Sequence, residues 1–425
     1  MDVIGKKPDH TTLTEAGGAV ELGNAVRPPG SPLEVLRVFL KLGLSSFGGP
    51  IAHIGYYREE FVVRRRWLAE QDFVDLVALC QFLPGPASSQ VGFSIGLLRA
   101  GYRGALAAWT GFTLPSAIVL VVFAHGAGAL TGSLGTGLLH GLKLVAVAIV
   151  AQAVFGMART LCPDRQRASI AVLTALIILF SASSMAQIGS ILLGGLLGLW
   201  LCRGAPPALE GHIVMPVSRR IGVAALTAFF ALLIGLPIVQ GLHVWPGTDL
   251  QLFNAFYRAG ALVFGGGHVV LPLLREAFVA HGWVSDDAFL AGYGATQAVP
   301  GPLFTFAAYL GTVVTPSPHG VPGAVLGLFG IFLPGILILL GTLPFWDTFR
   351  KRPDAQAAMR GVNASVVGLL GAALYSPIWT NAVTTPGDFG LALVGFVLLT
   401  AWRAPPLLVV VVGAVGGIVL ALTGR

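Results

Sequence analysis

Two Pro-Gly-Pro sequences, at 84–86 and 300–302, carry the groups in this chain that are best suited to hold a ligand. Each proline removes a backbone donor and clashes with the preceding turn, so each sequence predicts a break between two half-helices. A helix that restarts after a break presents unpaired N–H groups and the positive end of its dipole, and such termini bind anions. The chemistry predicted at the breaks is therefore noncovalent binding of a small oxyanion.

Glycines and hydroxyl groups surround both breaks and two Gly-rich stretches that precede them. Glycine lets the backbone approach a ligand closely, and hydroxyl groups donate hydrogen bonds. Any one of these glycines is more readily explained by close helix packing, whereas the recurrence of Pro-Gly-Pro with the same flanking Gln favours a binding site. The predicted substrate-binding residues of this set are Ser45, Ser46, Gly48, Gly49, Gln81, Pro84, Gly85, Pro86, Ser88, Ser89, Gly265, Gly266, Gly267, His268, Gln297, Pro300, Gly301, Pro302 and Thr305.

Basic residues inside apolar segments are the next candidates, because a charge within the membrane is costly and usually functional. Lys143 lies in the apolar run 138–157 and is added to the predicted substrate-binding residues. It either attracts an anion into a cavity or extends to a nearby interface, and the sequence supports both interpretations equally. Lys41 and Arg258 precede the Gly-rich stretches and are weaker candidates of the same kind.

Two Arg-Glu pairs are predicted to act in gating or proton coupling. They are Arg58 with Glu59 and Arg275 with Glu276, and an ordinary surface pair is an equal alternative for each. His268 titrates near neutral pH in principle, but a hydrogen-bonded structural histidine explains it more readily.

The composition predicts a polytopic membrane protein. Of the 425 residues, 55% are hydrophobic and 11% are charged, which a soluble protein of this length does not show. The net charge of +7 comes from Lys and Arg in short clusters between apolar runs, as the positive-inside rule expects, so nucleic acid is not an expected partner. The three cysteines, Cys80, Cys162 and Cys202, lack metal or redox spacing, and no metal or cofactor is expected.

An enzyme is not expected. The sequence 92–96 fits the G-x-S-x-G pattern, but that motif needs a strand-turn-helix elbow with acid and His partners, and here it falls in a membrane segment. No Walker loop or dinucleotide fingerprint occurs, so any transport activity must be secondary transport.

The second half of the chain repeats the first. The sequence Phe-Gly-Gly at 47–49 recurs at 264–266, an offset of 217 residues, and Pro-Gly-Pro recurs at an offset of 216. The domains predicted from this repeat are a disordered tail at 1–30, a first repeat at 31–202, a linker loop and linking helix at 203–249, and a second repeat at 250–425.

Loop charges predict how these segments are oriented. The loops near 159–168, 203–220 and 350–360 contain arginines and are expected in the cytoplasm, as is the N-terminus, whereas the loops near 131–136, 183–186, 245–250, 314–322 and 379–388 contain neither Lys nor Arg. Equivalent loops then fall on opposite faces. The predicted fold is an all-α polytopic membrane protein, with two inverted repeats of about six membrane segments each, joined by one linking helix.

The broken segments allow two topologies. The segments 33–47 and 71–99 either cross the membrane fully or form re-entrant hairpins, and the parity of the remaining helices is the same in both cases. Each arm of the second hairpin would contain about 11 residues, or roughly 16 Å of helix, about half of a 30 Å hydrocarbon core. The hairpin interpretation is therefore favoured, and the two breaks of each half are expected to meet near the membrane midplane.

The combination of these motifs resembles the chromate ion transporter family in both halves, over nearly the whole chain after the tail. The matching motifs are 47–50, 58–59, Trp67 and 81–90 in the first half, and 264–267, 275–276, Trp283 and 297–302 in the second. Gly267 departs from the pattern, because the first half has Pro50 at this place.

The resemblance implies a long, two-domain bacterial transporter of the inner membrane that exports chromate from the cytoplasm and gives chromate resistance. It implies chromate as the ligand, with sulfate as a chemically similar competitor. Transport of sulfate or another tetrahedral oxyanion is the alternative. The bilayer is the expected environment, and a homodimer is left open.

Overall fold

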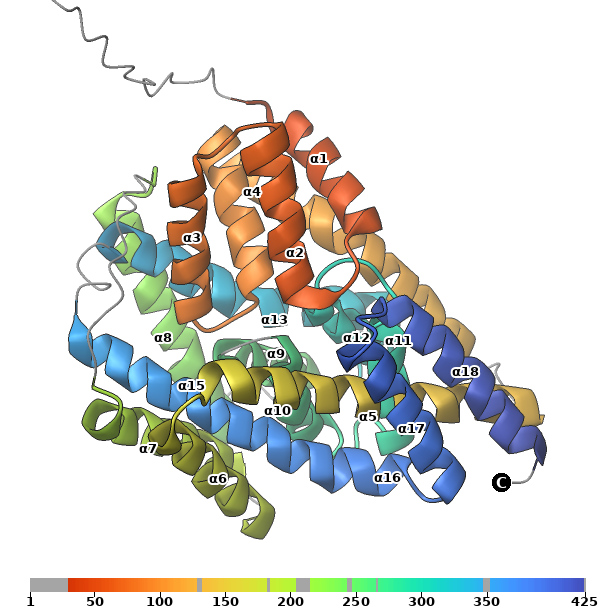
Figure 1. Cartoon of the computed structure of the whole chain (residues 1–425). Coiled ribbons are helices and arrows are strands. Elements are labelled where there is room, and N and C mark those ends of the chain that lie inside the picture. Colours follow the sequence, from red (N-terminus) through yellow and green to blue (C-terminus); the bar gives the residue numbers. More distant parts are fainter. Residues whose placement is uncertain are drawn as a thin grey trace, which may run out of the picture.

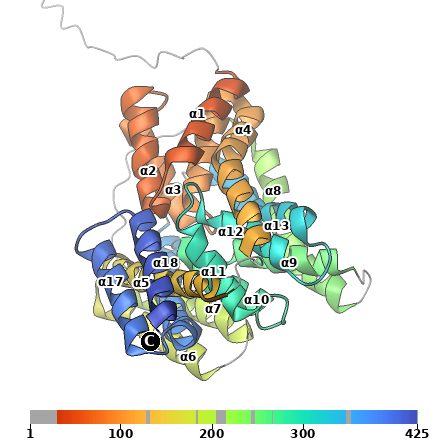
Figure 2. The ribbon, with the colours of Figure 1, turned by 90° about the vertical axis from the view of Figure 1, so that its right-hand side faces the viewer.

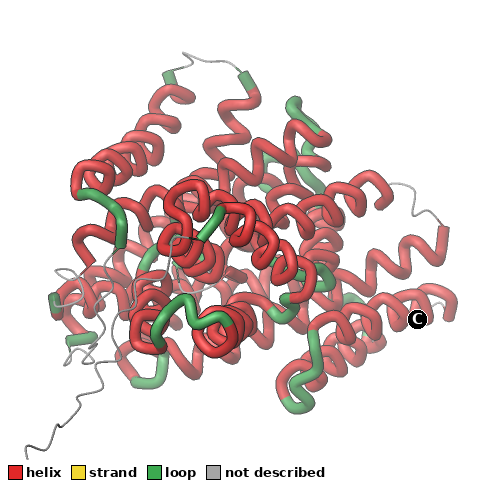
Figure 3. Tube along the Cα trace, turned by 90° about the horizontal axis from the view of Figure 1, so that it is seen from above, coloured by secondary structure: helices red, strands yellow, loops and turns green. Residues whose placement is uncertain are grey.

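The protein is described here by a computed structural model (Figure 1), which covers residues 30–127, 132–181, 184–203, 215–242, 247–264, 267–346 and 352–423. The predicted tail therefore lies outside the described residues, except for Gly30. The described residues form helices joined by loops, without a β-strand (Figure 3), which confirms the prediction of an all-α protein.

The first repeat begins with two broken helical pairs, which stand together at one end of the molecule (Figures 1 and 2). Pro32 occupies the first turn of α1, and the Ser31 hydroxyl caps this helix by accepting from the Glu34 N–H. The chain leaves α1 through Gly48, whose φ of 101° favours glycine. The helices of these pairs are α1 (Pro32–Ser45), α2 (Gly49–Tyr57) with the π-helical turn η1 (Arg58–Arg64), α3 (Glu70–Phe82) and α4 (Ala87–Ala127).

Two non-helical residues divide α4 into a short first arm and a long second arm. They are Ala100 and Gly101, the latter with φ of 63°. The helices that follow are α5 (Gly132–Leu161), α6 (Arg165–Phe180), α7 (Ser184–Leu201) and the linking helix α8 (Arg219–Gly241).

The second repeat has the same order of elements. Its broken pairs are α9 (Thr248–Ala261) with η2 (Gly267–Val269) and α10 (Val270–Phe278), then α11 (Asp286–Thr296) with η3 (Leu303–Thr305) and α12 (Phe306–Val313). The remaining elements are α13 (Gly320–Thr342) with η4 (Leu343–Phe345), α15 (Pro353–Ala373) continued by η5 (Leu374–Trp379) and α16 (Thr380–Ala382), α17 (Pro386–Thr400) and α18 (Pro406–Thr423).

Within the described part of the chain, six helices are long and apolar enough to cross a membrane. They are α4, α5, α8, α13, the α15–α16 segment and α18. Apart from α4, the helices of the broken pairs are shorter: α1 and α9 contain 14 residues each, which is about 21 Å of helix, less than a hydrocarbon core of about 30 Å. These lengths suit re-entrant hairpins.

The largest buried cluster surrounds the hairpins of the second repeat. Its members include Phe256 and Phe278, whose ring centroids lie 4.5 Å apart, and Phe289, Tyr293 and Phe306. Aromatic rings bury large areas, so these hairpins are held in a packed core and not in loose loops.

The two repeats exchange their terminal helix pairs. Helices α6 and α7 of the first repeat pack on α15 of the second, and α17 and α18 pack on α5 of the first. Both crossings use glycines at equivalent positions, because a Cβ on Gly141 would lie 2.1 Å from the Gly413 oxygen and one on Gly361 would lie 2.0 Å from the Gly194 oxygen. Small residues let helix backbones approach closely in membrane proteins.

The equivalent helices α5 and α15 run in opposite directions (Figure 1). Near the start of α15, Arg360 Nη1 donates to the Cys202 carbonyl at the end of α7, 2.8 Å away. Beyond the opposite end of the α15–α16 segment, at the start of α17, the Asp388 Oδ1 lies 2.6 Å from the His140 Nε2 near the start of α5. The repeats are therefore inverted, and the arginine-containing ends at 202–203 and 352–360 lie together, as the loop charges predicted.

Candidate anion-binding site

The four breaks meet in pairs, and each pair joins the two repeats. The Gly85 N–H donates to the Val263 carbonyl at 2.8 Å, and the Gly301 N–H donates to the Ser46 carbonyl at 2.9 Å. Gly85 and Gly301 are equivalent positions, as are Ser46 and Val263. Each Pro-Gly-Pro break of one repeat is therefore hydrogen-bonded to the Gly-rich break of the other.

The middle residue of each Pro-Gly-Pro sequence must be glycine for conformational and steric reasons. Gly85 has φ of 114° and Gly301 has φ of 102°, where side chains are strained. An added Cβ would also lie 2.9 Å from the Gly335 Cα and 2.8 Å from the Ser116 Oγ, respectively. Gly335 and Ser116 follow the equivalent prolines of α13 and α4, so the close approach is itself repeated. Pro84, Pro86 and Pro302 are buried in these breaks, and Pro300 is half-buried.

Hydroxyl groups of the first repeat gather beside a histidine that the sequence analysis missed. Ser46, Ser88 and Ser89 are all buried, and the Oγ atoms of Ser46 and Ser89 have no hydrogen-bond partner among the described residues. His53 of α2 is fully buried, and its Nδ1 lies 3.3 Å from the Ser88 Oγ. This contact brings the two breaks of the first repeat together, as predicted.

The start of α4 adds backbone donors to this group. The first N–H groups of a helix lack intrahelical partners, and here they belong to Ala87, Ser88 and Ser89. Gln90 stays out of the binding surface, because its Nε2 donates to the carbonyls of Pro84 and Gly335, each at 2.9 Å. Unpaired N–H groups and serine hydroxyls are donors that an oxyanion accepts from.

The second repeat gathers a different set of polar groups. His268 Nδ1 lies 2.7 Å from the Tyr293 hydroxyl, and Gln297 follows Tyr293 by four residues, at the end of α11. The Gln297 Nε2 has no hydrogen-bond partner among the residues that the structure describes. The Thr305 hydroxyl is buried but donates to the Pro302 carbonyl at 2.7 Å, so its hydrogen is already used.

Several predicted residues lie at the edge of this arrangement or outside it. Ser45 is exposed and its hydroxyl donates to the Lys41 carbonyl of its own helix, and Gln81 is exposed as well. Both lie outside the buried polar group because they sit on the outer side of α1 and α3. Gly48 is exposed, whereas a Cβ on Gly49 would meet nothing within 4 Å.

The Gly-rich stretch of the second repeat is partly outside the described residues, because Gly265 and Gly266 are not covered. Gly267 is buried, and an added Cβ would lie 3.5 Å from the Pro50 Cγ. The two residues that depart from the repeat pattern therefore face each other.

Lys143 is not brought to the breaks. Its Nζ lies 2.6 Å from the Asp287 Oδ1, and the Asp287 side chain is 74% exposed. Asp287 is in the first turn of α11, at a water-accessible position. This pairing fits the interfacial interpretation of Lys143 better than a place in the substrate path.

The two Arg-Glu pairs do not form ion pairs between sequence neighbours. Arg58 Nε lies 2.7 Å from the Glu70 Oε1, and Arg275 makes a bidentate pair with Asp286, with both N–O distances 2.8 Å. These are equivalent contacts, and each ties the end of one hairpin to the start of the next. Glu59 is exposed. A gating role for these arginines stays a prediction.

His53 and Tyr293 are the residues that sequence reasoning missed. Both lie in apolar segments close to a break. Lys143 was selected because a polar or charged side chain within an apolar segment usually has a function, and the same criterion would have selected His53 and Tyr293. Their partners, Ser88 and His268, could not be read from spacing because they come from the other hairpin of the repeat.

Comparisons with known proteins agree with this two-repeat arrangement. The family model described as chromate transporter matches residues 33–199 and again 250–418. A chromate transport protein of Pseudomonas aeruginosa is 30% identical over 408 residues, covering 92% of each chain. A chromate transport protein of Cupriavidus metallidurans is 26% identical over 409 residues, covering 94% of this chain and 95% of that one.

A shorter relative matches about one repeat. The uncharacterized transporter YwrA of Bacillus subtilis is 34% identical over 151 residues, which are 35% of this chain and 78% of that protein. No solved structure matches this chain.

Proposed function

We propose, because this chain belongs to the chromate transporter family, that it exports chromate from the cytoplasm and thereby gives chromate resistance. Its relatives are named as transport proteins, so it is a transporter and not an enzyme. The observation that carries the proposed site is the pairing of all four breaks across the repeat interface, by the bonds from Gly85 to Val263 and from Gly301 to Ser46.

The pairing of the breaks and the burial of the site support transport by alternating access. Ser46, His53 and Ser88 are buried, so an ion reaches them only when the hairpins move apart from their neighbours. Inverted repeats with a shared central site commonly move as two bodies, each motion opening one face. The cross-repeat bonds at Gly85 and Gly301 are the contacts that such a motion would break and remake in turn.

The membrane potential favours export of a dianion. With the inside negative, each charge gains about 2.3 kcal/mol per 100 mV on leaving, so a dianion gains about 4.6 kcal/mol. At about 1.4 kcal/mol per tenfold concentration ratio, this energy supports a ratio of outside to inside concentration of more than about a thousand. Export needs no obligatory coupling ion, although proton exchange is compatible with the fold.

The membrane placement is also part of the proposal. We expect a bacterial inner membrane, with the N-terminus and the arginine-containing ends near 159–168 and 352–360 in the cytoplasm. A homodimer stays a prediction, to be checked by cross-linking in the native membrane.

Sulfate is the alternative substrate, because a tetrahedral dianion of similar shape meets the same donors. The deciding measurement is uptake and release of chromate in proteoliposomes under imposed potentials of both signs, with sulfate as competitor. We expect chromate flux that follows the potential and is lost in Ser88→Ala. Flux of sulfate without flux of chromate would refute the substrate assignment, and chromate flux indifferent to Ser88→Ala would refute the site.

A further inference from the structure

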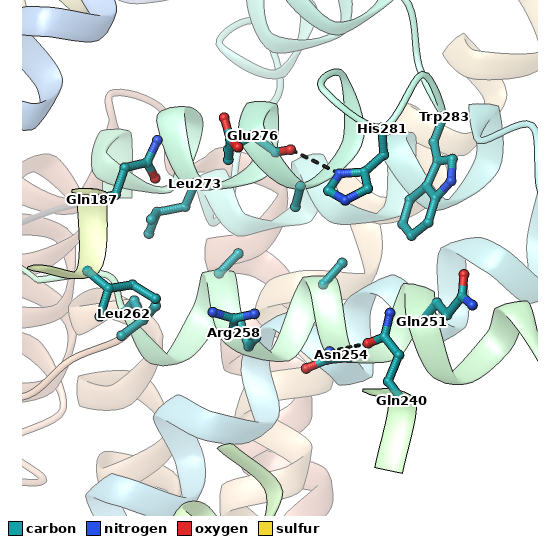
Figure 4. A pocket seen from close by; sticks show the side chains of 14 residues that line it. Gln187, Gln240, Gln251, Asn254, Arg258, Leu262, Leu273, Glu276, His281 and Trp283 are labelled. Atoms are coloured by element: carbon teal, nitrogen blue, oxygen red, sulfur yellow. Dashed lines mark hydrogen bonds between the residues drawn. The ribbon is translucent and has the colours of Figure 1, made fainter. Parts of the chain in front are cut away.

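A polar cavity of about 160 Å³ lies along the hairpin of α9 and α10, beside the end of α8 and the start of α7 (Figure 4). This volume is more than ten times the ~10–15 Å³ that a single water requires. Its polar lining includes Gln187, Gln240, Gln251, Asn254, Arg258 and His281. Leu262 and Leu273 form part of its apolar wall.

Arg258 brings to this cavity a positive charge that forms no direct ion pair with a described residue. Its guanidinium has no hydrogen bond or ion pair to any residue that the structure describes, and Figure 4 shows it in the space between α9 and α10. Glu276 also lines the cavity, and it interacts with a residue other than Arg258. A cation without a counter-ion beside apolar walls attracts an anion strongly, because little water screens it.

Amide groups stand beside this cation. The Asn254 Nδ2 donates to the Gln240 Oε1 at 2.6 Å, and the buried Asn254 Oδ1 has no partner among the described residues. The ends of an amide are assigned from their contacts, and turning both amides together keeps their mutual hydrogen bond, with Gln240 Nε2 donating to Asn254 Oδ1. In this arrangement the Asn254 Nδ2 takes the unpaired position and can donate to a bound anion. Arginine and amide N–H groups are the donors that oxyanions bind best.

One wall of the cavity borders the paired breaks. Arg258 lies in the last turn of α9, five residues before Val263, whose carbonyl accepts from the Gly85 N–H. Leu262, the residue next to Val263, is itself part of the cavity wall. The cavity wall therefore reaches the residue next to the backbone hydrogen bond that joins two of the breaks.

The first repeat supplies a matched comparison. Lys41 occupies the position equivalent to Arg258, also without a counter-ion among the described residues, but it is exposed on α1. The difference is consistent with the packing of the described elements, in which α8 packs on α9, whereas α1 packs on α4. Lys41 therefore offers the same charge outside the Arg258 cavity.

We propose that this cavity is an oxyanion vestibule, in which Arg258 and its neighbouring amides hold a small tetrahedral dianion before it reaches the paired breaks. The charge selectivity of the cavity stands independently of the substrate, whereas its place on the chromate path rests on the proposed function. The ligand class is a tetrahedral oxyanion, met by one guanidinium and by amide N–H groups.

The test measures charge selectivity without transport. Ala277 lines the cavity, so Ala277→Cys is labelled with a negatively charged and a positively charged methanethiosulfonate, and the chain without this cysteine gives the background. Sulfate is the protecting ion, because chromate oxidises thiols. We expect Arg258→Gln to lower the ratio of the two rates roughly tenfold, with Arg258→Lys close to the parent and Lys41→Gln unchanged.

Sulfate should slow labelling in the parent and not in Arg258→Gln. An unreactive cysteine at 277, a ratio indifferent to Arg258→Gln, or an absence of sulfate protection would each overturn the vestibule. If labelling is charge-selective and sulfate protects, but proteoliposomes show no chromate flux, the vestibule is supported and chromate is refuted as the substrate. If chromate flux is intact and labelling shows no selectivity, the vestibule alone fails.

Discussion

Ser45 and Ser46 are adjacent serines with opposite surroundings, and they give the sharpest test of the proposed site. Ser46 is fully buried at the break and its Oγ has no partner among the described residues. Ser45 is exposed and its Oγ donates to the Lys41 carbonyl at 2.8 Å. If the Ser46 hydroxyl awaits an anion, Ser46→Ala should weaken substrate binding without weakening the fold.

The magnitude follows from what each hydroxyl does. A hydrogen bond to a charged group contributes about 1.5–3 kcal/mol, so Ser46→Ala should raise the KM for chromate by roughly 10- to 150-fold. Removing a buried hydroxyl that lacks a partner costs no hydrogen bond and can stabilise the fold, by about 1 kcal/mol. Ser45→Ala should change neither the free energy of substrate binding nor that of unfolding by more than the ~0.5 kcal/mol typical of surface substitutions.

The assay pairs chromate flux in proteoliposomes with thermal unfolding of the same purified variants. A parental KM in Ser46→Ala would show that the Ser46 hydroxyl does not bind the substrate. The proposed role of Ser46 is also refuted if Ser46→Ala lowers the unfolding temperature, because the hydroxyl would then be part of the packing and not a free donor.

Three further predictions concern the fold that carries the site. Gly301→Ala should destabilise by about 1–3 kcal/mol in thermal unfolding, because φ is 102° and the new Cβ lies 2.8 Å from a serine hydroxyl. Gly361→Ala places a Cβ 2.0 Å from a backbone oxygen and should lower the free energy of unfolding by about 1–3 kcal/mol or more. The control, Gly371→Ala in the same helix, meets nothing within 4 Å and should leave this free energy nearly unchanged. Equal destabilisation by the two variants would contradict the close helix crossing at Gly361. The hydrogen bond from Arg167 lowers the pKa of Asp164 at the cap of α6, so its stabilising effect should be present above pH ~4 and lost as the pH falls further; acid unfolding of Asp164→Asn should show no such loss.

Much of the fold could be predicted from local sequence. Proline and glycine break helices through covalent geometry, so the four breaks appear in the chain as written, and Val263 and Gly85 lie where two of them were expected. The inversion of the repeats followed from loop charges, because topology depends on where Lys and Arg fall. Arg360 beside the Cys202 carbonyl shows two of the arginine-containing ends meeting as expected.

Contacts between distant segments could not be predicted in the same way. The sequence predicted that the breaks of one half meet each other, as the contact between His53 and Ser88 shows in the first repeat. It did not predict the backbone hydrogen bonds that join Gly85 to Val263 and Gly301 to Ser46 across the halves. Likewise Arg58 pairs with Glu70 and not with its neighbour Glu59. Such pairings depend on how packed helices approach in space, which one sequence without covariation does not record.

The exchanged helix pairs have a consequence for the inheritance of this architecture. Because α6 and α7 complete the packing of α15, and α17 and α18 complete that of α5, neither half has its full set of neighbours by itself. A half-length ancestor with this fold would have reached the same packing only beside a second copy inserted upside down. Gene duplication and fusion through α8 would then have placed both orientations in one polypeptide. Separate half-length chains reach this arrangement only if some copies insert in one orientation and some in the other.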